Sequence, residues 1–235
     1  MKNLIVASTS TLYGQSYLEY ILPEFGGLYG DVKEVVFIPF ARPGGATHDQ
    51  YTEFARKAFE KIDIAIKGVH SFSDPKSAVI NAKGIFTGGG NTFVLVKQLL
   101  DLNLMEILSD SIKSGAPYLG TSAGSNICGI NMRNTNDMPI VHPSSFNTLG
   151  ILPFNINPHY LDPDPKINHM GETREQRIKE FHTHNNIPVV GLREGSWLRV
   201  QGEEIHLKGG LDARIFEANK SPYEIPSGTS LKRLS

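Results

Sequence analysis

The sequence is poor in cysteine, in net charge and in long apolar runs, and each shortage narrows what the chain can be. Its one cysteine, Cys128, excludes an intrachain disulfide and a paired-cysteine metal site. Basic residues number 23 against 24 acidic ones, so the formal net charge is −1. That balance provides no bulk attraction to nucleic acid or to an anionic membrane, and a small neutral or zwitterionic partner fits it better.

No stretch approaches the roughly 20 consecutive apolar residues that a membrane helix needs. The first apolar run, Leu4 to Ala7, is also too short for the core of a secretory signal, and polar Ser8 to Ser10 follow it. We therefore expect a buried first strand and a cytoplasmic protein without membrane contact. The scarcity of cysteine favours the same compartment.

Short β-branched runs alternate with longer amphipathic segments along the chain, and this alternation predicts a parallel sheet covered on both faces. The predicted strands are residues 4–7, 34–39, 84–87, 117–120 and 188–192, the last one returning to the same sheet. The predicted helices follow a cap at Thr47, start at 91–92, and span 104–113 and 172–184. We expect one α/β domain over residues 1–235, flavodoxin-like, with a mostly parallel twisted sheet.

The C-terminal region has a different pattern from the rest. Residues 197–201, 204–207 and 213–216 are strand-like and are separated by glycines, which predicts a small antiparallel hairpin or meander. Before it, residues 130–164 are rich in asparagine, proline and histidine. We predict that this middle region is mostly loop, the kind of chain on which binding and catalytic residues concentrate.

The pentapeptide Gly120-Thr121-Ser122-Ala123-Gly124 directly follows the predicted strand 117–120. Small residues on both sides of a serine permit a sharp turn from strand to helix, which lifts the hydroxyl out of the turn beside a backbone N–H. Acyl transfer by serine requires that geometry. An inert tight turn has the same composition, so the pentapeptide alone leaves both interpretations open.

A second small-residue segment, Gly88-Gly89-Gly90, lies at the end of the predicted strand 84–87. Exposed backbone N–H groups at such a place bind negative charge. The segment has neither the spacing of a dinucleotide fingerprint nor a Walker lysine, so phosphate binding is weakly supported. If Ser122 is a nucleophile, this loop and the N–H of Ala123 could together stabilise the developing oxyanion.

A serine nucleophile needs a base, and eight histidines are available. His159 has the most suggestive setting, because Pro158 restricts the chain just before it and helps to hold the imidazole in one direction. The pair His182 and His184 is spaced by two and does not share a helix face, so a metal there is disfavoured. The remaining histidines have ordinary structural or surface interpretations or share the polar middle region: His48, His70, His142, His169 and His206.

The base in turn needs a carboxylate that orients it, and two positions are candidates. Glu194 follows the predicted strand 188–192 and has Gly191 and Gly195 near it; its bland interpretation is a turn carboxylate paired with Arg193. Asp137 lies in the polar middle region, where it could equally close its own turn. The residues alone leave this choice open.

Four separated motifs, in order, resemble the peptidase E family of α-aspartyl dipeptidases, which are serine peptidases with a fold related to class I glutamine amidotransferases. The motifs are residues 120–126, 157–160, 171–177 and 191–197. The resemblance covers nearly the whole chain. It implies hydrolysis after an N-terminal aspartate, with no cofactor and no metal.

The resemblance also implies roles for particular residues. Ser122 would be the nucleophile and His159 the general base and then acid, with N–H groups near Gly89 and of Ala123 as the oxyanion hole. The family has been described with the residue matching either Glu194 or Asp137 as the third member; we prefer Glu194, because a strand-end loop is the more rigid support.

An aspartyl substrate also requires groups that bind its charges. Arg174 is our candidate for the substrate's β-carboxylate, with Arg177 assisting, because a guanidinium can bind a carboxylate through two hydrogen bonds. Both arginines could instead be surface partners of Glu172 and Glu175. The substrate's α-ammonium needs an acceptor, for which the candidates are Glu172, Asp137 and Asn91.

Two other functions are kept as alternatives. One is a cyanophycinase-like hydrolase acting on another aspartyl polymer, and the other is a non-catalytic flavodoxin-like module that binds phosphate or a nucleotide at Gly88–Gly90. An amidotransferase is disfavoured, because that relative has cysteine where this chain has Ser122. We expect a monomer or a small homo-oligomer.

Overall fold

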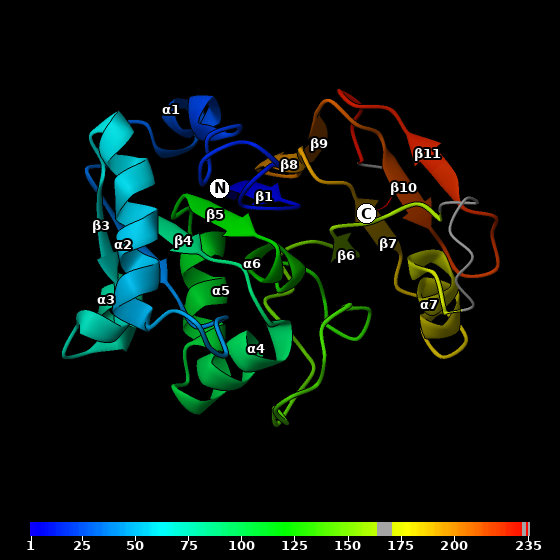
Figure 1. Cartoon of the computed structure of the whole chain (residues 1–235), viewed down its shortest axis with the longest axis horizontal. Coiled ribbons are helices and arrows are strands. Elements are labelled where there is room, and N and C mark those ends of the chain that lie inside the picture. Colours follow the sequence, from blue (N-terminus) through cyan, green and yellow to red (C-terminus); the bar gives the residue numbers. More distant parts are fainter. Residues whose placement is uncertain (164–170, 232–233, 235) are drawn as a thin grey trace.

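The structure is a computed structural model in which residues 1–163, 171–231 and 234 are described. Its larger sheet has seven strands in the order β3-β2-β4-β5-β1-β8-β9 (Figure 1). Five of these strands are parallel, and the β8–β9 hairpin continues the sheet antiparallel to β1. The strands are β1 Asn3–Ala7, β2 Glu34–Ile38, β3 Ala65–Gly68, β4 Ile85–Thr87, β5 Tyr118–Thr121, β8 Ser196–Gln201 and β9 Glu204–Gly209.

Helices cover both faces of this sheet because its central strands are apolar on both sides. In β1, Leu4 and Val6 belong to one buried cluster, and Ile5 and Ala7 belong to the other. Helices α4 and α5 contribute to the first cluster, and α1 and α2 to the second. The helices are α1 Phe25–Tyr29, α2 His48–Phe59, α3 Pro75–Ile80, α4 Thr92–Asp101, α5 Met105–Lys113, α6 Ala123–Asn126 and α7 Arg174–Phe181. The predicted fold class is thereby confirmed.

A second sheet of four strands, in the order β11-β10-β7-β6, lies to one side of the first (Figure 1). Its strands are β6 Asn155–Pro158, β7 Val189–Leu192, β10 Ala213–Phe216 and β11 Tyr223–Ile225. The prediction that 188–192 returns to the main sheet is therefore wrong. Residues 213–216 also leave the predicted meander, because β10 pairs with β7 and β11 while β8 and β9 pair with each other.

The sequence pattern does not predict strand β6, because two of its four residues are asparagines. Both asparagine side chains are buried and hydrogen-bonded to neighbouring loop chain. The Asn155 Oδ1 accepts from the backbone N–H groups of Ile130 and Asn131, and the Asn157 amide donates to the Asn134 carbonyl. These asparagines thus tie residues 130–134 to the strand.

Short 3-10 turns lie at Leu22–Glu24, Glu60–Ile62 and Val69–Ser71. Helix α2 begins at the cap predicted at Thr47, and the structure shows it to be a capping box, in which Thr47 and Gln50 each bond the other's backbone N–H. Among the described residues, no helix combines the length and the apolar character that crossing a membrane would need.

Candidate active site

Ser122 lies in a sharp turn between β5 and α6, with a φ of 53° that side-chain-bearing residues rarely adopt. Close backbone packing around it requires glycine at two places. A Cβ on Gly120 would lie 2.5 Å from the Gly124 carbonyl oxygen, and one on Gly124 would lie 2.2 Å from the Thr87 carbonyl oxygen. The small residues of the pentapeptide therefore permit the turn that presents Ser122.

The imidazole of His159 lies between a serine and a glutamate. Its Nε2 is 2.9 Å from the Ser122 Oγ, and its Nδ1 is 2.6 Å from the Glu194 Oε1. A carboxylate only accepts hydrogen bonds, so Nδ1 carries the proton and the Nε2 of the neutral ring is left to accept from Ser122. The three side chains therefore have the connectivity of a serine-hydrolase triad.

These three residues come together because they end strands in two different sheets. Ser122 follows β5 of the main sheet, His159 follows β6, and Glu194 lies two residues beyond β7. Strands β6 and β7 run parallel with Pro158 opposite Leu192, so both residues emerge at the same edge. Ser8 links this edge to β1: its Oγ accepts from the His159 backbone N–H at 2.8 Å and donates to the Leu192 carbonyl at 2.7 Å.

Asp137, the other predicted carboxylate, bonds to a helix start and to a neighbouring threonine. Its Oδ2 accepts from the backbone N–H of Thr92 at 2.7 Å and from the Thr135 hydroxyl at 3.1 Å. Thr92 is the first residue of α4, where a negative charge is favourable. Asp137 therefore holds the 135–137 loop against a helix start, while Glu194 is the carboxylate against His159.

The glycine loop lies directly beside the serine. A Cβ on Gly89 would be 2.8 Å from the Ser122 Cβ, so only glycine fits there. Within the described part of the chain, neither the Gly89 N–H nor the Ala123 N–H donates to a protein acceptor. The Tyr51 hydroxyl donates to the Gly89 carbonyl at 3.1 Å and so fixes the loop from behind. Two backbone donors are thus left beside Ser122.

Ser122 and His159 open into a pocket of about 170 Å³. Its lining is largely polar: Thr92, Ser122, Ala123, Asn126, Thr135, Asn136, Asp137, Pro158, His159 and Arg174. Burial lowers the pKa of Arg174, and nearby Arg177 lowers it further, while Asp137 and Glu194 act in the opposite direction. No carboxylate among the described residues lies within 4 Å of the Arg174 guanidinium. The pocket therefore presents an arginine that can bind an anion.

The other predicted substrate residues already have partners. Asn91 caps α4 by accepting from the Val94 N–H, and its amide donates to the Met138 carbonyl. Glu172 and Arg177 pair with each other at 3.5 Å on the surface. Neither Asn91 nor this pair lines the pocket described above.

Sequence reasoning missed Ser8, Tyr51 and Asn126. Ser8 carries a readable signal, because it follows a predicted strand at the edge where parallel sheets place their ligands. Tyr51 looks like an ordinary core residue of an amphipathic helix. Asn126 belongs to the serine motif, lines the pocket and has a buried Oδ1 without a hydrogen-bond partner among the described groups.

No cluster of metal-ligating side chains is present in residues 1–163, 171–231 and 234. His169, one of the histidines considered from the sequence, lies outside the described residues. Cys128 is buried, and its burial raises the pKa of the thiol to about 12, so it is a packed side chain instead of a reactive one.

Comparison with known proteins finds the same family along the chain. The family model described as "Peptidase family S51" matches residues 4–208. The chain is 46% identical to "Peptidase E" of Streptomyces coelicolor over 232 residues, covering 99% of this chain and 94% of that protein. It is 41% identical to the "Probable alpha-aspartyl dipeptidase" of Drosophila melanogaster, covering 95% and 93%.

Two solved structures share the fold. A putative peptidase E protein from Listeria monocytogenes superposes with a TM-score of 0.69 at 22% identity, covering 90% of this chain and 100% of that one. A peptidase from an acI-B1 actinobacterium superposes with a TM-score of 0.71 at 17% identity, covering 98% and 96%.

Proposed function

The chain belongs to peptidase family S51, and from that premise we propose that it is a serine dipeptidase that cleaves Asp-X dipeptides after the N-terminal aspartate. The observation that carries the proposal is the continuous contact from Glu194 through His159 to Ser122 beside a pocket that contains Arg174. The name of the Drosophila relative, "Probable alpha-aspartyl dipeptidase", supports the substrate class. The buried single thiol of Cys128 fits the cytoplasmic location expected from the sequence.

In the first half of the reaction, Ser122 Oγ attacks the carbonyl carbon of the aspartyl residue while His159 Nε2 takes the hydroxyl proton. The resulting oxyanion is stabilised by the N–H groups of Gly89 and Ala123, which have no protein acceptor among the described residues. The C–N bond then breaks, and the amine of the second residue leaves with the proton from His159. Glu194 stabilises the imidazolium that forms in between.

In the second half, water replaces the amine. His159 takes a proton from water, the hydroxyl attacks the ester carbon, and the ester C–O bond breaks with the proton returning to Ser122 Oγ. Free aspartate and the second amino acid are the products. No metal or cofactor enters any step.

Arg174 gives the proposed preference for aspartate a physical basis. A guanidinium in a small, partly buried pocket binds a carboxylate through two hydrogen bonds and discriminates against neutral side chains of similar size. Asp137 lines the same pocket, and its Oδ1 accepts no hydrogen bond from the described residues, so it is our candidate for the substrate's α-ammonium. Asn91 and Glu172 are weaker candidates because of their existing bonds.

The test is hydrolysis of Asp-Leu by purified protein, compared with Leu-Asp, Asn-Leu and a β-linked aspartyl-arginine dipeptide. We expect release of leucine from Asp-Leu alone, and a loss of at least about 1000-fold in kcat for Ser122→Ala. Ser125→Ala is the matched control, because that hydroxyl is buried and donates to the Ala7 carbonyl at 2.6 Å. Activity that persists in Ser122→Ala would contradict the proposed nucleophile, and faster cleavage of the β-linked substrate would point to a cyanophycinase-like enzyme.

A further inference from the structure

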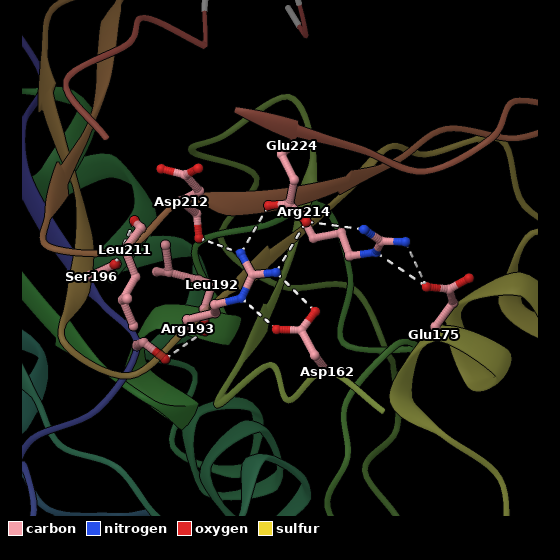
Figure 2. A network of polar contacts seen from close by, with 10 residues as sticks. Asp162, Glu175, Leu192, Arg193, Ser196, Leu211, Asp212, Arg214 and Glu224 are labelled. Carbon is pink, nitrogen blue, oxygen red and sulfur yellow. Dashed lines mark hydrogen bonds and ion pairs between the residues drawn. The ribbon is translucent and has the colours of Figure 1, made fainter. Parts of the chain in front are cut away.

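Arg193 directly precedes Glu194 in the chain, but its guanidinium bonds to other residues. The Arg193 side chain is mostly buried. Nε and Nη2 donate to the two oxygens of Asp162 at 2.8 and 2.9 Å. Nη1 and Nη2 donate to the two oxygens of Glu224 at 2.9 and 3.0 Å, and Nη1 also donates to the Asp212 carbonyl at 2.6 Å. An arginine side chain has five N–H donors, and all five are used here (Figure 2).

The contacts continue through a second arginine. Arg214 Nη1 donates to Glu224 at 3.0 Å, and its Nε donates to Glu175 at 3.1 Å (Figure 2). Glu224 therefore lies between two guanidiniums, and they hold its pKa below its ordinary value. We call Asp162, Arg193, Glu224, Arg214 and Glu175 the ionic brace.

Both ends of the ionic brace lie next to residues of the proposed active site. Asp162 is three residues beyond His159, and Arg193 immediately precedes Glu194. Glu175 immediately follows Arg174 in α7. The brace thus joins the segments that carry the base, the acid and the anion-binding arginine, while β10 and β11 supply the residues between them.

Glu194 needs such support because its own surroundings are open. Its side chain is 53% exposed, and it lies between β7 and β8 with Gly195 next to it at a φ of 86°. A flexible glutamate at such a site loses side-chain and backbone freedom when it is held against His159. Anchoring the preceding residue through five hydrogen bonds lowers that cost.

Because all five N–H donors of Arg193 are used, this side chain has a second effect on the contact between Glu194 and His159. A guanidinium with free donors, one residue from Glu194, would compete with His159 for the carboxylate. Because Asp162 and Glu224 occupy both of its edges, Glu194 keeps its short contact with Nδ1.

We propose that Arg193 is a positioning residue for the triad, and that the Arg214–Glu175 arm of the ionic brace positions Arg174 for the substrate carboxylate. This proposal rests on the proposed function. The two arms make different predictions: loss of Arg193 lowers kcat, whereas loss of Arg214 raises KM for aspartyl substrates.

The test compares the hydrolysis of Asp-Leu by Arg193→Met, Arg214→Met and wild type. Rates are measured well below the unfolding temperature of each variant and are divided by the concentration of folded protein, determined by circular dichroism. We expect Arg193→Met to lose about 10- to 100-fold in kcat with a much smaller change in KM. Arg214→Met is expected to raise KM by about tenfold with kcat little changed. Arg193→Lys keeps the charge but not the fork, so we expect an intermediate kcat, and it serves if the methionine variant does not fold.

Arg199→Met is the matched control, since Arg199 also makes several bonds, to the Leu4, Gly27 and Val200 carbonyls, but none to the ionic brace. This variant should lose stability and keep the wild-type kcat and KM.

A kcat for Arg193→Met within about twofold of wild type would overturn the proposal. If wild type fails to cleave Asp-Leu, the proposed function fails instead. The rate of Ser122 labelling by a fluorophosphonate then decides on Arg193: slower labelling in Arg193→Met supports its role, and equal labelling overturns it.

Discussion

Ser122 and His159 both have a φ of 53°, in the left-handed region that residues with side chains seldom occupy. Each such position costs on the order of 1–2 kcal/mol and persists only where neighbouring contacts impose it. For His159 the imposing contact is Ser8, and for Ser122 it includes a hydrogen bond from its N–H to the Ala7 carbonyl at 3.1 Å. The end of β1 therefore holds both residues in the orientation in which their side chains meet.

The choice between the two carboxylates can be tested by removing one charge at a time. We expect Glu194→Gln to lower kcat by about 100-fold or more, because an amide at this place no longer fixes the Nδ1–H tautomer and cannot stabilise the imidazolium. Asp137→Asn should keep kcat within about threefold and lose a few tenths of a kcal/mol to about 1 kcal/mol of stability at the start of α4. Steady-state kinetics and thermal melts of both variants check this, and an equal loss of kcat in Asp137→Asn would contradict the assignment.

Tyr51→Phe tests whether the glycine loop must be held in place. The substitution removes the donor to the Gly89 carbonyl while keeping the ring. Because that carbonyl belongs to the loop beside Ser122, we expect kcat to fall about tenfold and KM to change little. Tyr17→Phe is the control: the Tyr17 hydroxyl is 3.4 Å from the Tyr51 hydroxyl and makes no bond to the loop. A wild-type kcat in Tyr51→Phe would show that the loop keeps its geometry without this bond.

At this scale, the sequence was most informative where one residue type has few other uses. A serine among small residues and a histidine after a proline pointed to Ser122 and His159, which the structure brings within 2.9 Å of each other. The choice of acid stayed open because both Asp137 and Glu194 lie on polar turns, and only their positions in space differ. Asn91 is a candidate acceptor for the substrate's α-ammonium from the sequence, but its side-chain oxygen caps α4.

Among the elements, the parallel strands of the main sheet were predictable because each is a short apolar run with helices between. The second sheet was not. Strand β7 has the same apolar composition as a strand of the main sheet, and the residues Val189–Leu192 do not indicate which strand it pairs with. Its partner β6 carries two asparagines and was predicted as loop. Sheet membership depends on long-range pairing, which local pattern does not encode.

The packing of α6 against β4 gives the element-scale prediction. A Cβ on Gly124 would lie 2.2 Å from the Thr87 carbonyl oxygen, which is backbone and cannot give way cheaply. We expect Gly124→Ala to destabilise the protein by more than about 2 kcal/mol, because α6 must shift away from β4. Gly26→Ala in α1 is the control, since nothing lies within 4 Å of its added Cβ and alanine favours a helix. Urea unfolding of both variants provides the measurement, and an unchanged midpoint in Gly124→Ala would contradict the close approach.

Over the whole molecule, the proposed active site depends on two sheets staying in register with each other. Ser122 follows a strand of the first sheet, and His159 and Glu194 follow strands of the second, so a shift between the sheets would separate the proposed nucleophile from its proposed base. The ionic brace adds ion pairs to the apolar packing of the second sheet. Its carboxylates Asp162, Glu175 and Glu224 all have a pKa below the ordinary value, mainly because arginine or lysine side chains donate hydrogen bonds to them.

The brace therefore makes stability depend on pH in a defined direction. A carboxyl group whose pKa is lower in the folded state contributes stability that is fully present above its unfolded pKa, near 4.5 for Glu224, and that disappears as pH falls through the folded value. Glu224→Gln should therefore be less stable than wild type at pH 7, and the difference should shrink between pH 5 and pH 3. This stability difference should change by less than the one-proton maximum of about 1.4 kcal/mol per pH unit, since water screens the partly exposed Glu224 carboxylate.

Glu203→Gln is the control, because Glu203 pairs with Lys2 while 84% exposed. The change in stability that this substitution causes should be near zero at every pH. Urea midpoints for both variants between pH 3 and pH 7 give the comparison. A difference for Glu224→Gln that stays constant over this range would mean that shape at this position, and not its charge, is what the fold requires.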